Sequence, residues 1–199
     1  MSDMAYHHGN LRRALLDAAL DTIATDGVAA LNLRALARSC GVSHAAPTHH
    51  FGDRQGLLTA IATEGYEGLA ATTAATWQET GSFLEVGVAY VRYAVTHPGH
   101  FEVMFRPDLV HADDPELARA RSASAAMLYG PVDSVAAVEG DAGARRIAAT
   151  AAWALVHGIA TLWLQGSLRA DASGPTDDPE ALTRAAARHL FGSGSATSA

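Results

Sequence analysis

Two histidines near the middle of the chain raise metal binding as a first possible chemistry. His97 and His100 are three residues apart, and Glu102 follows two residues later. A zinc site needs three or four protein ligands of these kinds, and the sequence offers no clear further ligand for this group. Pro98 and Gly99 between the histidines are typical of a break between helices. We therefore interpret this stretch as a cap and a turn, and we expect no metal site.

Covalent catalysis is a second possibility, and the sequence gives it little support. It contains no G-x-S-x-G motif, no phosphate-binding loop and no His-Glu-x-x-His motif. Cys40 is the single cysteine, so an internal disulfide and a zinc site built from cysteines are both excluded. Cys40 is either a small residue packed in a turn or a redox sensor. We expect no enzyme, no catalytic residue and no cofactor.

A third chemistry, hydrogen bonding to phosphates and to base edges, is indicated by residues 32–54. This stretch has three arginines and one acid, although the whole chain has a formal net charge of −7. A local positive field can attract a nucleic acid even when the total charge is negative. Histidines can donate to bases or phosphates, and small residues permit close approach to DNA. The arginines are Arg34, Arg38 and Arg54, and the histidines are His44, His49 and His50.

These side chains must be held by short helices, and the sequence predicts two of them. Asn32 can cap a helix over residues 33–39, and Ser43 can cap a second helix over residues 44–50. Cys40-Gly41-Val42 forms the turn between them. Two short helices joined by a small turn that contains glycine are the pattern of a helix-turn-helix, here about residues 32–51.

The helices that support this motif are predicted from the spacing of apolar residues. Residues 10–26 carry apolar side chains at every fourth position, which form one helical stripe, and Gly27 is suited to end that helix. Asp53 can cap a fourth helix that runs toward Trp77. Further helices are predicted over residues 83–96, 99–105, 116–138 with a break at Gly130-Pro131, 143–168 and 179–191.

The predicted fold is therefore all-α, with about nine helices. Residues 1–53 would form a three-helix domain that contains the helix-turn-helix, residues 54–192 a larger helical bundle, and residues 193–199 a flexible tail. No uninterrupted apolar run of about 18 residues appears, so no membrane span is expected. The N-terminal residues do not resemble a secretory signal, and a cytoplasmic protein is expected.

The stretch NLRALARSCGVSHAAPTHHFGDRQGLL, together with the helix before it, resembles the DNA-binding domain of TetR-type transcriptional regulators over residues 10–65. The stretch AWALVHGIATL at residues 152–162 resembles the Trp-His-Gly subgroup of their C-terminal domains. The resemblance implies a homodimer that binds double-stranded operator DNA through its N-terminal helices. It also implies a C-terminal bundle that binds a small molecule, forms the dimer and releases DNA when the small molecule binds.

The resemblance and the helical positions together predict which residues touch DNA. One departure concerns Thr48, because the family usually has a tyrosine there, whose hydroxyl reaches a phosphate. Arg54 stands where the family usually has a lysine and can bind phosphate bidentately. His50 is interpreted as a packed histidine rather than a DNA contact. Arg38 can either contact DNA or pair with an acid on the surface. The predicted DNA-binding residues are Asn32, Arg34, Ser43, His44, Ala45, Ala46, Thr48, His49 and Arg54.

The C-terminal bundle is expected to bind an apolar or aromatic small molecule and to form the dimer. Aromatic and sulfur-containing residues fit the lining of a pocket, and they fit an ordinary core equally well. The predicted pocket residues are Tyr90, Tyr93, Phe101, Met104, Phe105, Met127, Trp153 and His157. The predicted dimer residues are Leu155, Ile159, Leu162 and Trp163, beside the small residue Gly158 and neighbouring alanines that permit close helix approach.

Two other functions remain open at this point. The chain could be a helical sensor of small molecules whose DNA binding is weakened, as Thr48 and the modest positive charge allow. It could also be an all-α enzyme that uses its histidine-rich loops. The leading hypothesis is a ligand-responsive, dimeric transcriptional repressor.

Overall fold

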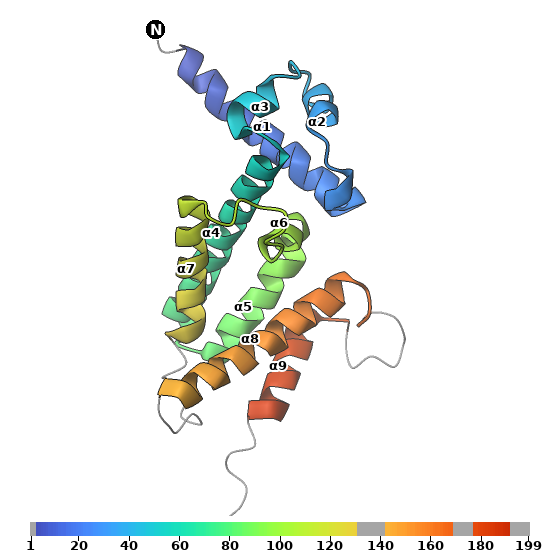
Figure 1. Ribbon diagram of the computed structural model, residues 1–199. Coiled ribbons are helices and arrows are strands. Elements are labelled where there is room, and N and C mark those ends of the chain that lie inside the picture. Colours follow the sequence, from blue (N-terminus) through green and yellow to red (C-terminus); the bar gives the residue numbers. More distant parts are fainter. Residues whose placement is uncertain (1–2, 131–141, 169–176, 192–199) are drawn as a thin grey trace, which may run out of the picture. The chain divides into compact units, whose positions relative to one another are not determined.

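A computed structural model describes residues 3–130, 142–168 and 177–191, and within them it contains nine α-helices and one short 3-10 helix (Figure 1). The all-α prediction is therefore confirmed. The N-terminal elements are α1 (Asp3–Asp26), η1 (Val28–Ala30), α2 (Leu33–Ser39), α3 (Ala46–Phe51) and α4 (Arg54–Thr80). The remaining helices are α5 (Phe83–Thr96), α6 (Pro98–Met104), α7 (Pro115–Tyr129), α8 (Ala142–Leu164) and α9 (Pro179–Phe191).

The chain divides into two compact units, which differ from the predicted division at residue 53. Unit 1 consists of residues 1–66 and 97–121, and unit 2 of residues 67–96 and 122–199. The helix-turn-helix therefore shares a unit with α6, with the first half of α4 and with the start of α7. Residues 193–199, the predicted tail, lie outside the described residues, as does the part of the predicted 116–138 helix after Gly130.

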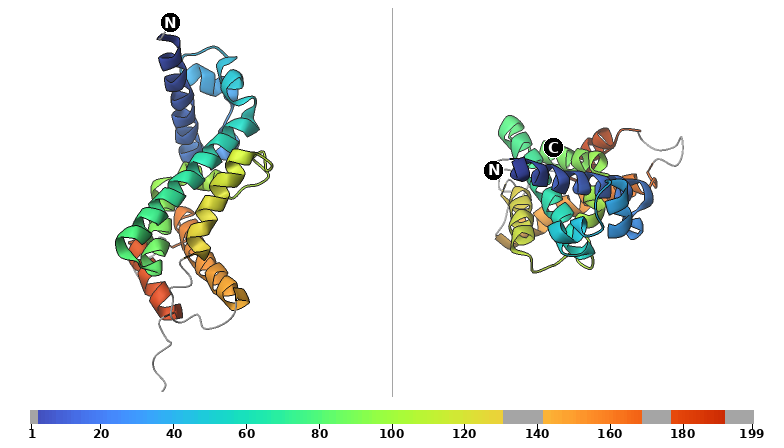
Figure 2. Two further views of the ribbon diagram at one scale, coloured as in Figure 1. Left: turned by 90° about the vertical axis from the view of Figure 1, so that its left-hand side faces the viewer. Right: turned by 90° about the horizontal axis from the view of Figure 1, so that it is seen from above.

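Unit 1 is built on the apolar stripes that the sequence predicted. Leu15, Ala19 and Ile23 of α1 are buried, and α2 and α3 pack beside α1 (Figure 2). Along α4 the predicted stripe is also buried, from Leu57 to Gly65. Burying these side chains supplies the main stabilising term for the unit, since each large apolar side chain contributes about 1.5–3 kcal/mol.

The second helix of the helix-turn-helix begins later than predicted. Ser43 was expected to cap a helix over residues 44–50, whereas α3 begins at Ala46 and its N-cap, Ala45, makes no side-chain hydrogen bond. In a helix capped by Ser43, the first intrahelical bond would join the Ser43 carbonyl to the N–H of residue 47, and Pro47 has no N–H. The backbone oxygen of Ser43 accepts the Ala46 N–H at 3.0 Å instead, so a turn of backbone replaces the cap.

Unit 2 packs α5 against α8 and α9. The helices α5 and α8 approach closely at Gly87, where an added Cβ atom would lie 3.2 Å from Val156 Cγ1. The part of α4 that belongs to unit 2 packs similarly on α5, because a Cβ at Gly68 would lie 3.1 Å from the ring of Tyr93. The small residues therefore set the helix separations in this unit.

Candidate functional site

The first helix of the helix-turn-helix begins at a side-chain cap. Asn32 Oδ1 accepts hydrogen bonds from the backbone N–H groups of Arg34 at 2.9 Å and Ala35 at 3.2 Å. The predicted cap is confirmed. Arg34 and Arg38 extend from the exposed face of α2, and in the described part of the chain neither forms an ion pair. Their charges are therefore available to an external anion.

The second helix leaves its polar face exposed, as a DNA-reading helix requires. Of the predicted DNA-binding residues here, Ser43, His44, Ala45, Thr48 and His49 are exposed and Ala46 is half-buried. Only Pro47 is fully buried in this helix. The turn before it uses Gly41 at a φ of +66°, a backbone conformation that glycine adopts without strain. The surface is small, polar and free of bulky apolar groups, which fits close approach to a groove.

An arginine that the sequence analysis overlooked lies beside the end of this helix. The guanidinium of Arg12 on α1 stacks over the ring of Phe51, 5.3 Å from its centroid, and His50 also contacts the Phe51 ring at a centroid distance of 6.2 Å. His50 is half-buried, in agreement with a packed histidine. The adjacent arginines Arg12 and Arg13, near the middle of α1, were the available sequence signal.

Arg54, at the start of α4, is tied to the backbone of unit 1. Its Nε donates to the Leu31 carbonyl at 3.0 Å and its Nη2 to the Val28 carbonyl at 2.6 Å. A guanidinium has five N–H donors, so these bonds occupy two of them. A phosphate contact through the remaining donors stays a prediction. Asp53 Oδ1 caps α4 by accepting from the Gly56 N–H at 2.8 Å, as predicted.

A polar network connects α1, α4 and α6 inside unit 1. Glu64 on α4 accepts from Arg13 of α1 at 2.6 Å and from His100 of α6 at 3.1 Å. Burial raises the pKa of Glu64, but the hydrogen bonds from Arg13 and His100 outweigh it, and the pKa lies below its usual value. Burial lowers the pKa of His100, and Glu64 offsets this only in part. His100 thus serves as a neutral donor inside the protein.

The predicted pocket residues of unit 2 include a chain of hydrogen bonds. Trp153 Nε1 lies 3.4 Å from the Tyr90 hydroxyl, which lies 2.9 Å from His157 Nδ1. An indole N–H only donates, so the tyrosine accepts from Trp153, and it donates to His157 in the neutral tautomer whose Nδ1 carries no proton. Burial lowers the pKa of His157, which favours this neutral form. Tyr93 is also buried, and Met127 of α7 is half-buried.

The other predicted pocket residues belong to unit 1. Phe101 and Phe105 make an edge contact at a centroid distance of 5.2 Å, and Phe105 contacts Tyr66 at 5.6 Å. The Tyr66 hydroxyl donates to the Met104 carbonyl at 2.6 Å. Tyr66 was not predicted, because its position on the stripe of α4 is that of any core residue. The pocket residues are predicted as one set, whereas the structure divides them between two units.

The predicted dimer residues are only partly exposed. Ile159 and Trp163 are 8% and 3% exposed and lie in the core of the chain itself. Leu155 is half-buried, and Leu162 is 43% exposed. Ile159 and Trp163 are therefore largely covered within the chain, and the part of all four residues in a dimer stays a prediction.

A different stripe of α8 is exposed. It begins at Ile147, which is 72% exposed, and continues through exposed Ala151 and Ala154 and half-buried Gly158 to Leu162, positions that follow one helical face. A Cβ at Gly158 would meet nothing within 4 Å. Leu190 and Phe191 at the end of α9 are exposed as well. Sequence spacing contained this signal, since two large apolar residues stand at the ends of a helically spaced run of three small ones.

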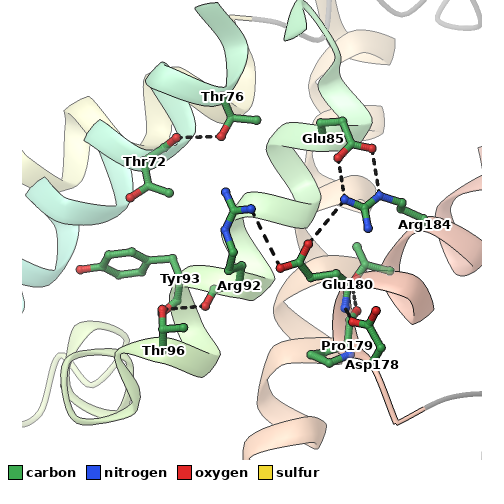
Figure 3. A network of polar contacts seen from close by, with 11 residues as sticks. Thr72, Thr76, Glu85, Arg92, Tyr93, Thr96, Asp178, Pro179, Glu180 and Arg184 are labelled. Carbon is green, nitrogen blue, oxygen red and sulfur yellow. Dashed lines mark hydrogen bonds and ion pairs between the residues drawn. The ribbon is translucent and has the colours of Figure 1, made fainter. Parts of the chain in front are cut away.

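Ion pairs hold α9 against α5 (Figure 3). Arg184 of α9 binds Glu85 of α5 through two hydrogen bonds, at 3.0 and 2.8 Å, and Glu180 lies 4.0 Å from Arg92. The hydrogen bonds from Arg184 lower the pKa of Glu85 despite a smaller opposing effect of burial. This arrangement fixes the helix that carries Leu190 and Phe191.

The geometry defines a class of protein: a helix-turn-helix with an exposed reading helix, followed by a helical bundle. Residues 15–61 match the family described as "Bacterial regulatory proteins, tetR family", and residues 83–190 match "Tetracyclin repressor-like, C-terminal domain". The chain belongs to the TetR family of transcriptional regulators. These regulators are non-enzymatic DNA-binding proteins, so the prediction that the chain is not an enzyme is confirmed.

Solved structures agree with this assignment. A protein of unknown function from a Rhodococcus species is 37% identical, with a TM-score of 0.74, and the alignment covers 94% of this chain and 95% of that one. The TetR family transcriptional regulator PfmR from Thermus thermophilus is 21% identical, with a TM-score of 0.64 and coverage of 89% and 96%; this likeness concerns the fold. No curated protein matches the sequence.

The helix α8 is long and apolar enough to cross a membrane by length and composition alone, but only 22% of its most apolar window is buried within the chain. A core helix of a soluble protein passes the same test of composition. Family membership identifies this chain as a soluble regulator. The exposed apolar surface of α8 therefore needs another explanation than a bilayer.

Proposed function

We propose that the chain is a ligand-responsive repressor that binds operator DNA. The observation that carries this proposal is the exposed turn that leads into α3, where Ser43, His44 and Ala45 face solvent, together with Arg34 and Arg38, which form no ion pair within the described residues. In this proposal α3 enters the major groove and reads base edges, and the α2 arginines bind the phosphate backbone. Phosphate contacts set the position of the protein, and base contacts set the sequence that it selects.

The protein binds this DNA as a homodimer. The exposed stripe from Ile147 to Leu162 on α8, together with Leu190 and Phe191 on α9, supports a seam between two copies. Apolar area of this kind is stabilised when a partner covers it, by about 25 cal/mol per Å², and Gly158 permits close helix approach. Two heads related by a two-fold axis read half-sites about 34–36 Å apart on a palindromic operator.

An apolar or aromatic small molecule in the C-terminal bundle releases the DNA. The aromatic residues of unit 2 support this preference, and the hydrogen-bonded chain of Trp153, Tyr90 and His157 supplies polar groups among them. Pockets of this composition are mostly apolar, with a few polar groups that orient the ligand. The Trp153-to-Gly158 stretch also supports membership of the Trp-His-Gly subgroup, and a DNA-binding regulator with one cysteine fits the cytoplasm.

Selection from a random pool of duplex oligonucleotides with the purified protein tests the proposal. We expect an enriched palindrome, tight binding, and affinity that falls steeply with salt because phosphate contacts release counterions. Arg34→Ala should weaken binding, whereas the matched control Arg188→Ala, at an exposed arginine of α9, should not. Failure to enrich any sequence would refute the proposal.

A second function is favoured by one observation. Thr48 is exposed on α3, where the resemblance implies a tyrosine that reaches a phosphate, and threonine is too short for the same reach. A sensor with weakened DNA binding would bind an apolar small molecule but enrich no duplex. Thr48→Tyr distinguishes the two functions: it should tighten binding to an already enriched operator, and restore measurable binding if the head is weakened.

A further inference from the structure

One peptide segment in unit 1 is held from two sides by charged side chains. The N–H of Val28, the first residue of η1, donates to Glu102 Oε1 of α6 at 2.9 Å. The carbonyl of the same residue accepts from Arg54 Nη2 at 2.6 Å, and Arg54 Nε also binds the Leu31 carbonyl at 3.0 Å. We call Arg54 and Glu102, with the peptide groups of Val28 and Leu31 that they bind, the Val28 clamp.

The clamp lies directly before the surface that is proposed to meet DNA. Leu31 precedes Asn32, and Asn32 caps α2 by accepting from the backbone N–H groups of Arg34 and Ala35. Displacement of the Leu31 carbonyl would therefore move the cap and the start of α2. Arg34 sits in that first turn, and α2 packs against α3, so the phosphate-binding and base-reading positions move together.

If each charge acted alone, Arg54 and Glu102 would have opposite effects on DNA binding. An arginine at the start of α4 could attract phosphate by its charge. A glutamate on the same unit repels phosphate, and it would only weaken DNA binding. The geometry points to a shared role for the two residues, because each side chain is half-buried and directs polar atoms to backbone groups of one loop. Bonds of this kind involve a charged partner and are about twice as strong as neutral ones.

We propose that Arg54 and Glu102 are positioning residues for DNA binding: the Val28 clamp holds the η1 loop so that α2 and α3 present their contacts in register. This inference rests on the proposed operator binding. The inference predicts that an acid, Glu102, is needed for tight DNA binding, although its negative charge alone would repel phosphate. The Val28 clamp also ties η1, which precedes α2, to α6 and to α4, through one hydrogen bond on each side of Val28.

The test compares four variants in duplex binding, measured by fluorescence anisotropy on an enriched operator with the full-length protein. Glu102→Ala removes the acceptor of the Val28 N–H, and we expect affinity about tenfold lower, the equivalent of one charge-assisted hydrogen bond. Glu102→Gln keeps an oxygen that can accept this N–H, so its affinity should match or exceed that of the original protein. Asp21→Ala removes an exposed acid of α1 outside the clamp and should leave binding unchanged or tighter.

Arg54→Lys completes the set, because it keeps the charge but loses the planar fork that joins two carbonyls. We expect it to bind at least several-fold more weakly than the original protein. Hydrogen exchange of the peptide covering residues 27–36 provides a readout on the free protein. Protection there should fall in Glu102→Ala and Arg54→Lys but not in Glu102→Gln, while thermal melting shows that each variant is folded.

The inference is overturned if Glu102→Ala binds as tightly as the original protein, if Glu102→Gln loses as much affinity as Glu102→Ala, or if Arg54→Lys binds normally. The first and third results would leave the proposed function intact, because operator binding itself would persist. If the original protein enriches no duplex, the proposed function fails and the inference fails with it. Loss of exchange protection without loss of affinity would also overturn the positioning role.

Discussion

Asn32 offers a way to separate helix capping from DNA contact at a single position. Its side chain makes two hydrogen bonds to the first turn of α2 and is exposed to solvent. Asn32→Ala removes both bonds and should lower the free energy of unfolding by about 1 kcal/mol. For a chain of this size, that loss corresponds to a fall in Tm of roughly 2–4 °C.

Two further substitutions keep the cap, and one of them adds a negative charge. Asn32→Ser retains a capping oxygen, so stability and DNA affinity should both stay close to the original values. Asn32→Asp also caps, and its charge is favourable at a helix N-terminus, so stability should not fall. At about 6 Å from a phosphate, however, the added charge weakens binding by about 0.7 kcal/mol in water. Because more than one phosphate lies near a docked helix, we expect DNA affinity to fall about tenfold.

Thermal melting and operator-binding titrations on the same samples provide the assay. The expected pattern is a loss of stability in Asn32→Ala alone and the largest loss of affinity in Asn32→Asp. The added charge should also make the affinity of Asn32→Asp recover in part at high salt relative to the original protein, since screening weakens the repulsion. If Asn32→Asp binds operator as tightly as Asn32→Ser, the start of α2 is not close to the DNA backbone and the proposed docking is wrong.

Three other predictions concern the base contacts, the dimer and pH. His44→Ala should change the preference among operator sequences in a selection experiment, whereas Arg34→Ala should weaken all sequences and reduce the salt slope by about one phosphate contact; an identical, uniform loss in both would contradict this division. Leu162→Glu should raise the dissociation constant of the dimer by roughly 100-fold or more in sedimentation equilibrium, because the dimer would bury an unpaired charge. The control Gln78→Glu, at an exposed residue of α4, should leave this constant unchanged. An unchanged dimer in Leu162→Glu would exclude the α8 seam. Burial lowers the pKa of His157 below 6.5, so its contribution to stability is complete above pH 6.5 and is lost as the pH falls from 6.5 toward the lower pKa of the folded state. Between pH 7.5 and 5.5, urea unfolding should therefore show a smaller loss of unfolding free energy in His157→Asn than in the original protein. An equal loss in both would assign the pH dependence to other groups.

Local patterns in the sequence were sufficient for most of the helices and for two of the caps. Apolar stripes predicted α1 and α4 because burial acts on side chains three and four residues apart. Asn32 and Asp53 were predicted as caps because a cap bonds to residues two or three positions later. The Ser43 cap failed for a reason that is also local: Pro47 has no N–H to donate to the Ser43 carbonyl, so the helix does not begin directly after Ser43.

Contacts between distant residues escaped this reasoning. Arg54 bonds to carbonyls 23 and 26 residues earlier, and Glu102 to an N–H 74 residues earlier. No periodicity connects such positions, and a carbonyl carries no residue-type signal, since every residue has one. The sequence could therefore assign Arg54 to phosphate on charge alone, without any indication of the loop that it holds.

The arginines of unit 1 show how far charge alone can mislead. Arg34 and Arg38 are exposed without an acidic partner in the described residues, Arg13 is bound to Asp17 and Glu64, and Arg54 is bound to backbone oxygens. An unpaired guanidinium can bind a phosphate and release the counterions of the DNA at full effect, whereas a paired one must first give up its partner. The DNA-binding strength of this acidic chain therefore depends less on how many arginines it has than on which ones the fold has left without an internal partner.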